Sequence, residues 1–150
     1  MNTPQVIVKE GSFDNDVAQQ VNQNFANGTL SLGLGQLSAI AASGAINPNV
    51  SQAYVITKST AAAALTLGAP VAGAPIYNGQ GQNIGGNDGV VISIFSNTAE
   101  AHTVTATGLL QTGSADVNEA TFAAYAGASL VLQAYKGLWN VIASTQITFG

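Results

Sequence analysis

The chain has 150 residues, a length that fits one domain with or without an extension. Only 7% of its residues are charged, against about 25% in an average soluble domain, and the net charge is −4 with no arginine. Binding to a phosphate backbone needs clustered cations, so this composition excludes nucleic acid as an expected partner. The absence of cysteine excludes disulfide frameworks, thiol chemistry and cysteine-bound zinc.

A mean hydropathy of +0.28 makes a membrane location worth testing. A spanning helix needs about 20 consecutive apolar residues. The two best runs, residues 61–76 and 120–135, are interrupted by prolines and by glycine and polar residues respectively, and the first residues lack the pattern of a signal peptide. We therefore expect no membrane partner. Solubility usually relies on surface charge, and a surface with this few charges therefore indicates that partners cover much of it.

The first third of the chain predicts an arm with one short helix. Residues 13–26 read as that helix, with Asp14 as its N-cap and a stop at Asn27-Gly28. A spacing of four places four apolar residues on one stripe: Phe13, Val17, Val21 and Phe25. Residues 29–46 consist mainly of Gly, Ser, Ala and Leu without a clean period. We interpret residues 1–46 as the arm and residues 47–150 as a separate domain.

The remainder predicts β-structure. Residues 129–135 and 138–144 read as a hairpin around the two-residue turn Lys136-Gly137, and residues 78–89 read as a loop because they contain five glycines. Residues 121–128 fit a helix or an extended run. Further strands are expected at 53–57, 62–67, 90–96, 102–107 and 146–149. About seven short strands in about 100 residues are typical of a mainly β fold, here a jelly-roll-like β-sandwich.

The titratable residues do not predict catalysis. The one close acidic pair of the β-region, Asp116 and Glu119, is expected in a surface loop rather than across one substrate bond. His102 is the only histidine, as a Ser-His-Asp triad or most zinc sites would require, but we expect it on a strand surface beside Glu100. We therefore expect no enzymatic activity, no metal and no cofactor.

Two further features allow binding interpretations. The glycine-rich loop at residues 78–89 lacks the GK[ST] ending of a phosphate loop, so we interpret it as a plain loop. Tyr135 and Trp139 flank the 136–137 turn, where they either present a sugar-stacking face or pack across the two strands.

Three segments resemble a known group of proteins: AYVITKSTAAAALTLGAPVAG, DGVVISIFSNTAEAHTVTATGLL and ATFAAYAGASLVLQAYKGLWNVIAS. They are similar to runs in small β-rich structural proteins of tailed bacteriophages, of the head decoration (cement) or head-fibre type. The resemblance covers roughly residues 53–144 and is a pattern of strands and turns. The segment VNQNFANGTLSLG is not covered well, and no catalytic residues come with the resemblance.

The resemblance implies a jelly-roll-like domain on the exterior of the virion capsid, made in the host cytoplasm. Its implied partners are the major capsid protein and further copies of this chain, with a trimer favoured over a dimer. Low charge and small residues suit such interfaces, whose cores are depleted in charge. The stripe Phe13, Val17, Val21 and Phe25 is then the predicted capsid contact. The alternative is a fibre or receptor-binding module that recognises host-surface glycans through Tyr135 and Trp139.

Overall fold

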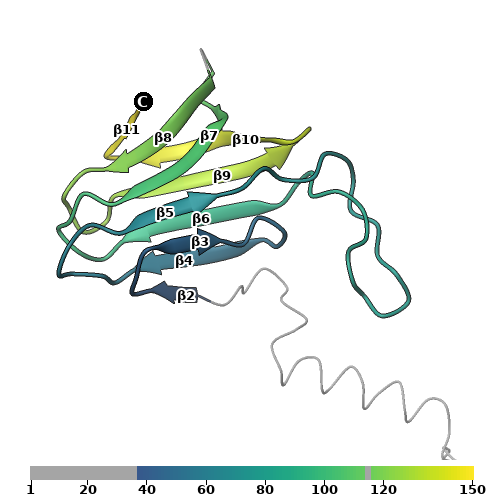
Figure 1. Ribbon diagram of the computed structural model, residues 1–150, viewed down its shortest axis with the longest axis horizontal. Coiled ribbons are helices and arrows are strands. Elements are labelled where there is room, and N and C mark those ends of the chain that lie inside the picture. The colour runs from purple at the N-terminus through teal and green to yellow at the C-terminus, as the bar shows by residue number, and fades with distance from the viewer. Residues whose placement is uncertain (1–36, 114–115) are drawn as a thin grey trace, which may run out of the picture. The chain divides into compact units, whose positions relative to one another are not determined.

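The computed structural model describes residues 37–113 and 116–150, which form one compact unit beginning at Leu37. The expected helix at residues 13–26 and its stripe of Phe13, Val17, Val21 and Phe25 lie outside the described residues. The fold is mainly β, as predicted (Figure 1). Its strands are β2 (Leu37–Ile40), β3 (Gly44–Ile46), β4 (Gln52–Ile56), β5 (Ala64–Leu67), β6 (Val91–Ser96), β7 (Thr103–Gln111), β8 (Asp116–Phe122), β9 (Ser129–Tyr135), β10 (Leu138–Thr145) and β11 (Ile147–Phe149).

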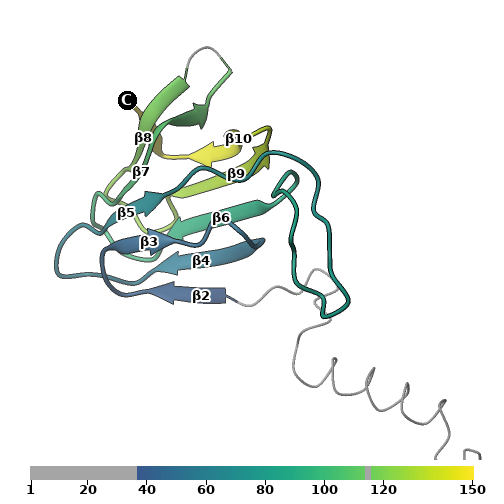
Figure 2. The ribbon, with the colours of Figure 1, turned by 45° about the vertical axis from the view of Figure 1, so that its right-hand side comes forward.

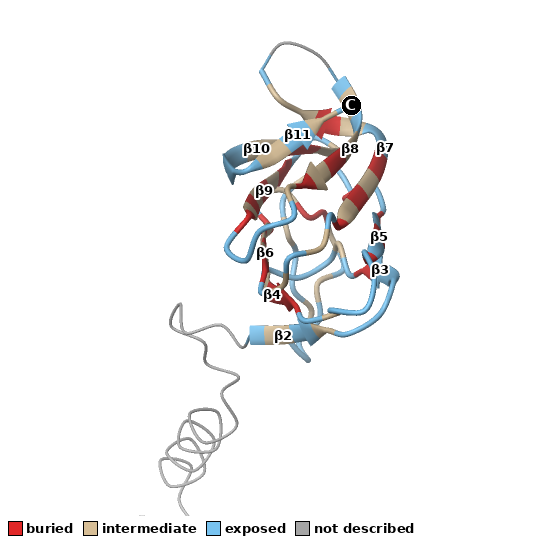
Figure 3. Cartoon of the chain, turned by 90° about the vertical axis from the view of Figure 1, so that its left-hand side faces the viewer, coloured by how far each residue is buried: buried red, intermediate tan, exposed pale blue. Residues whose placement is uncertain are grey.

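The strands form one mixed sheet that curls into two layers around the core (Figure 3). One layer contains β2, β4, β6, β9 and β10, and the other contains β3, β5, β7, β8 and β11. β7 joins the layers because its first part pairs with β5 and its last residues, Leu110 and Gln111, pair with β10. Between these two parts β7 departs from regular pairing with β8, around Gly108 at φ 68°.

From β2 to β7 the chain alternates between the layers, so that neighbours within each layer are parallel. β2, β4 and β6 run parallel in one layer, and β3, β5 and β7 run parallel in the other. The C-terminal strands then add by antiparallel pairing, apart from the contact of β10 with β7. A jelly roll consists of antiparallel strands, so this parallel winding differs from the jelly-roll-like connectivity expected from the sequence.

The core lies between the layers and is made by alternate residues of each strand. β6 illustrates the rule, because Ile92 and Ile94 are fully buried while Val91, Ser93 and Phe95 are partly exposed. The largest fully buried side chains of the core are Trp139, Phe122, Ile56, Leu65, Ile92, Ile94, Leu110, Leu130 and Leu132. Trp139 also donates a hydrogen bond from Nε1 to the Gly68 carbonyl at 2.9 Å. Through this bond, Trp139 connects the start of the β5–β6 loop to β10.

Replacing Trp139 by alanine tests this central position. We expect Trp139→Ala to lower the free energy of unfolding by about 3–5 kcal/mol, because it leaves a large cavity. The change also leaves the Gly68 carbonyl without its indole donor. Urea denaturation followed by circular dichroism measures the loss. Tyr135→Ala is the matched control, since Tyr135 is 54% exposed on the same hairpin and its removal should cost far less.

Most expected strands are confirmed. The hairpin has the predicted bounds within one residue. Lys136 and Gly137 have φ values of 52° and 83°, and positive φ at both central residues is typical of two-residue hairpin turns. Residues 78–89 form a loop, and residues 121–128 contain the end of β8 followed by a loop.

The expected arm was wrong for residues 37–46. These residues form β2 and β3, which pair in parallel with β4 and β5. The Ile46 side chain is 3% exposed and joins the core. Strands of three or four residues are too short to show a clear alternating pattern in the sequence. They are stabilised by pairing with strands that follow later in the chain. The boundary of the β-domain is therefore at residue 37 rather than at residue 47.

Candidate functional site

The β5–β6 loop, residues 68–90, is the most conspicuous surface feature, and it projects from one end of the domain (Figures 1 and 2). Val91 follows this loop, and the parallel register places the starts of β4 and β2 beside the start of β6. Leu37 therefore lies at the same end. The 136–137 turn is there as well, because Asp88 Oδ1 accepts a hydrogen bond from the Lys136 amide at 2.7 Å. We call this region the loop end.

Backbone and amide side chains brace the loop. Its two halves are joined by backbone hydrogen bonds, including Ile84 N to Ile76 O at 2.7 Å and Gly86 N to Ala74 O at 2.9 Å. The Asn83 side chain accepts from the amides of Ile76 and Gly85 and donates to the Gly86 carbonyl. Asn78 uses its side-chain oxygen in the same way at the tip. The loop therefore has a built structure despite its glycine-rich composition.

Gly86 shows how closely the two halves of the loop approach. A Cβ atom at this position would lie 2.0 Å from the Gly73 carbonyl oxygen, a distance at which backbone must move. Only glycine therefore allows the backbone bonds that close the loop.

The loop presents apolar side chains to solvent. Ile76, Tyr77 and Ile84 are 59%, 67% and 67% exposed, and Val71 is 56% exposed nearer the base. Asp88 is the only charged residue of the whole loop, and its carboxylate binds the Lys136 amide. A braced, nearly uncharged loop with apolar side chains at its surface is typical of a contact site for another macromolecule.

A shallow groove of about 410 Å³ lies beside the loop end on the β9–β10 hairpin. Its polar groups are the amide side chains of Gln133 and Asn140, and Tyr135 and Ile142 are 54% and 58% exposed at its wall. The Lys136 ammonium lies 5.4 Å from the centre of the Tyr135 ring. The lining residues are Gly89, Gln133, Ala134, Tyr135, Asn140 and Ile142.

Trp139 does not contribute to this groove, which corrects the expected sugar-stacking pair. Trp139 is fully buried, whereas Tyr135 is exposed. The hairpin register explains the difference, because Tyr135 lies opposite Leu138 and the next residue, Trp139, points to the other side of the sheet. The two aromatic side chains therefore occupy opposite faces and do not pack as a cross-strand pair.

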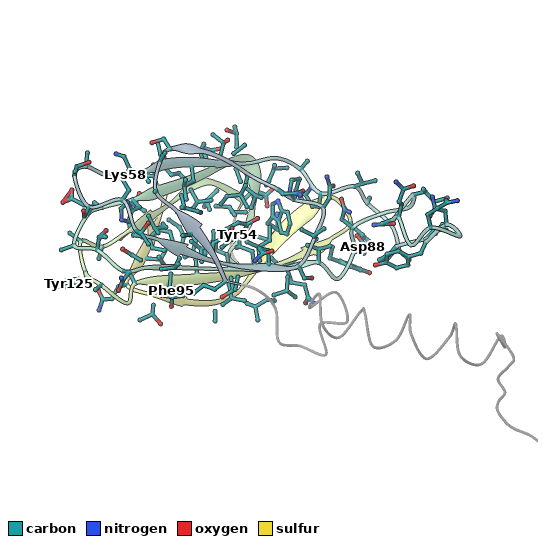
Figure 4. The ribbon with its side chains drawn as sticks, turned by 90° about the horizontal axis from the view of Figure 1, so that it is seen from below. Tyr54, Lys58, Asp88, Phe95 and Tyr125 are labelled. Carbon is teal, nitrogen blue, oxygen red and sulfur yellow. The ribbon has the colours of Figure 1, made fainter. Side chains whose placement is uncertain are left out.

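His102 belongs to a hydrogen-bond network with Thr98 and the carbonyl of Lys58. Figure 4 shows Lys58 and Asp88 toward opposite ends of the domain, so this network lies far from the loop end. The prediction of a surface histidine was wrong, because His102 is fully buried. Its Nδ1 accepts a hydrogen bond from the Ala63 amide at 2.9 Å. The ring proton of the neutral form is therefore on Nε2, which lies 2.7 Å from Thr98 Oγ1 and donates to it.

Thr98 completes this network by donating from Oγ1 to the Lys58 carbonyl at 3.2 Å. Burial lowers the pKa of His102 below its usual 6.5. Glu100 raises that pKa and Lys58 lowers it, each by a smaller effect. The neutral His102 ring thus joins two loops, the β4–β5 loop that contains Lys58 and Ala63 and the β6–β7 loop that contains Thr98.

The acidic pair lies on a strand rather than in a loop. Asp116 and Glu119 belong to β8, where residues three apart point to opposite faces. Asp116 accepts a hydrogen bond from the Gln111 side chain, and Glu119 accepts one from Thr105 Oγ1 at 3.0 Å. The loop prediction failed because the strand is polar and half exposed. The two carboxylates do not face one bond.

Within residues 37–113 and 116–150, no group of three His, Asp or Glu side chains gathers to hold a metal ion. The same residues include no helix long and apolar enough to span a membrane. The described surface is thus distinguished by the apolar loop and the hairpin groove. No protein-family model matches the chain, and no curated protein matches it either.

Proposed function

We propose that this protein is a structural component of a bacteriophage virion that decorates the outside of the head and stabilises it. Its partner is the major capsid protein, and further copies of the chain join it, with a trimer favoured over a dimer. Two sequence features support the proposal: the resemblance over residues 53–144 and a charge content of 7%. The proposal keeps the layered β-domain of that resemblance but not its antiparallel jelly-roll connectivity.

The observation that carries the proposal is the braced loop at residues 68–90. Loops longer than about 12–15 residues are uncommon and are usually functional or disordered. This one is cross-linked by hydrogen bonds yet exposes Ile76, Tyr77 and Ile84, an arrangement that favours binding over chemistry. Leu37, the first described residue, lies at the same end as the projecting loop. We infer that the loop end faces the capsid.

The loop contact is tested by a charged substitution at its tip. We expect Tyr77→Asp to weaken binding to purified phage heads at least about tenfold, because burying an ionised carboxylate in an apolar contact is costly. Cosedimentation with heads measures the affinity, and electron microscopy shows whether the protein is outside the shell. Tyr125→Asp is the control, since Tyr125 is similarly exposed in the loop after β8. Equal binding by both variants and the wild-type chain would remove the loop from the contact.

A second candidate function is recognition of host-surface glycans, for which the hairpin groove is the favouring observation. Exposed Tyr135 supplies an aromatic face, and Gln133 and Asn140 supply amide hydrogen-bonding groups beside it. Trp139 has no part in this candidate because it is buried. Screening soluble oligosaccharides against the wild-type chain and Tyr135→Ala distinguishes the functions, since only a glycan-binding module would show saturable binding that the substitution removes.

A further inference from the structure

The tip of the β5–β6 loop, residues 78–82, is organised by the side chain of Asn78. Its Oδ1 accepts hydrogen bonds from the amides of Gln80 and Gln82, each at 2.9 Å. Its Nδ2 donates to Gln82 Oε1 at 2.8 Å. Backbone hydrogen bonds from Asn78 N to Gln82 O and from Gly81 N to Asn78 O, both at 2.9 Å, complete the tip. The tip therefore uses both the acceptor and the donor of the Asn78 amide.

Gly79 follows Asn78, and the conformation of the tip does not account for a glycine at this position. A Cβ atom at residue 79 would meet no heavy atom within 4 Å, and its φ lies outside the left-handed region, unlike that of Gly81 at 80°. Gly79 is exposed, and none of the hydrogen bonds among the described residues uses its amide. Gly79 thus leaves an accessible amide nitrogen next in the chain to the Asn78 side chain.

We propose that the Asn78–Gly79 pair is a self-modification site, at which the Asn78 amide is converted into a carboxylate. The Gly79 nitrogen loses its proton, attacks Cγ of Asn78 and closes a cyclic succinimide. The bond from Cγ to Nδ2 breaks, and Nδ2 takes up a proton and leaves as ammonia. Water then opens the ring at either of its carbonyls, which gives aspartate at residue 78 or the isoaspartate isomer. Water is the only co-reactant.

The hydrogen bonds of the tip favour this attack. Negative charge develops on Oδ1 when the Gly79 nitrogen adds to Cγ, and the Gln80 and Gln82 amides already donate to Oδ1 at 2.9 Å. Donors held at about 2.7–3.1 Å from a developing oxyanion stabilise it without reorganisation. Because glycine has no Cβ, the backbone at residue 79 also allows a close approach.

The modification alters the loop contact with the capsid, a consequence that rests on the proposed function. Asp88 is the only charged residue of the loop, so a carboxylate at residue 78 adds a negative charge beside exposed Tyr77. The donor to Gln82 Oε1 is lost. In the isoaspartate product the backbone also runs through Cβ and Cγ of residue 78, which displaces the backbone groups that close the tip. Conversion is therefore expected to weaken binding to heads.

Peptide mapping by mass spectrometry tests the chemistry on the full-length chain without phage heads. During incubation at mildly alkaline pH we expect aspartate and isoaspartate at residue 78, at a rate that rises with pH and is at least that of a synthetic peptide of residues 76–84. Gly79→Ala should slow conversion at least about tenfold, because its methyl group obstructs the approach of the nitrogen, while the open surroundings keep the tip folded. Asn87, which is 3% exposed and precedes Asp88, is the internal control and should stay intact.

An Asn78 that stays intact in the folded chain after the peptide has converted would overturn the modification site. Equal conversion of the wild-type chain and Gly79→Ala would do the same, because the attack depends on the missing Cβ. Fluorescence of Trp139, the only tryptophan and fully buried, reports that each chain is folded.

Asn78→Asp imitates one product permanently and tests the consequence. We expect it to bind purified heads at least about tenfold more weakly than the wild-type chain, because an ionised carboxylate is costly to bury in the contact. Gly79→Ala should bind like the wild type. If Asn78→Asp binds heads undiminished while Tyr77→Asp does not, the consequence is overturned. If both variants bind undiminished, the loop contact of the proposed function fails, and peptide mapping still decides the modification site.

Discussion

Removing residues 1–36 is expected to abolish attachment to phage heads while the β-domain of residues 37–150 keeps its fold. The domain has its own core, and its first strand begins at Leu37. The removed segment contains the residues of the expected helix, with the stripe Phe13, Val17, Val21 and Phe25. We expect so short a helix to form only when a partner buries this stripe. Cosedimentation of the truncated chain with heads measures the loss, and Trp139 fluorescence confirms the fold.

A single substitution isolates the stripe from the rest of the segment. Burying one such side chain is worth about 1.5–3 kcal/mol, and about 1.4 kcal/mol corresponds to a tenfold change in affinity. Phe25→Asp should therefore weaken head binding by at least about tenfold. Gln23→Asp adds the same charge away from the stripe and should bind like the wild-type chain. Undiminished binding by the truncated chain would show that the β-domain makes the whole contact.

Acid is expected to destabilise the domain through His102. The neutral ring is required because Nδ1 accepts the Ala63 amide proton at 2.9 Å, and a proton on Nδ1 would place two donors against each other. Burial holds the pKa of folded His102 below 6.5, so the unfolded chain binds the proton first as the pH falls. The contribution of His102 to stability is therefore complete well above pH 6.5. It is lost progressively between pH 6.5 and the lower pKa of the folded state.

Urea denaturation at pH values from about 8 to 5, followed by Trp139 fluorescence, measures this dependence. His102→Gln removes the titration and should flatten the part of the profile that lies just below pH 6.5. His102→Ala should destabilise at every pH, because the buried Ala63 amide loses its acceptor at a cost of about 1–3 kcal/mol. A wild-type profile that runs parallel to that of His102→Gln throughout this range would contradict the assignment.

The strands that the sequence predicted well are those whose pattern is local. β6 alternates buried and partly exposed residues along its length, and the β9–β10 hairpin needs only two adjacent strands and a turn that tolerates positive φ. The five glycines of residues 78–89 predicted the loop there. The apolar side chains that matter for the proposed contact were also visible in the sequence, but their exposure was not.

Only the tertiary structure decided the features that depend on distant partners. β2 and β3 are strands because β4 and β5 pair with them in parallel, and no turn signal marks such a pairing. His102 is buried because Ala63 and Thr98 meet its two ring nitrogens from different loops. Trp139 faces inward because the hairpin register sets its side. The sequence by itself determined a weakly charged, mainly β chain, whereas the curling of the sheet into two layers decided which residues meet solvent, since layer packing follows from contacts remote in the chain.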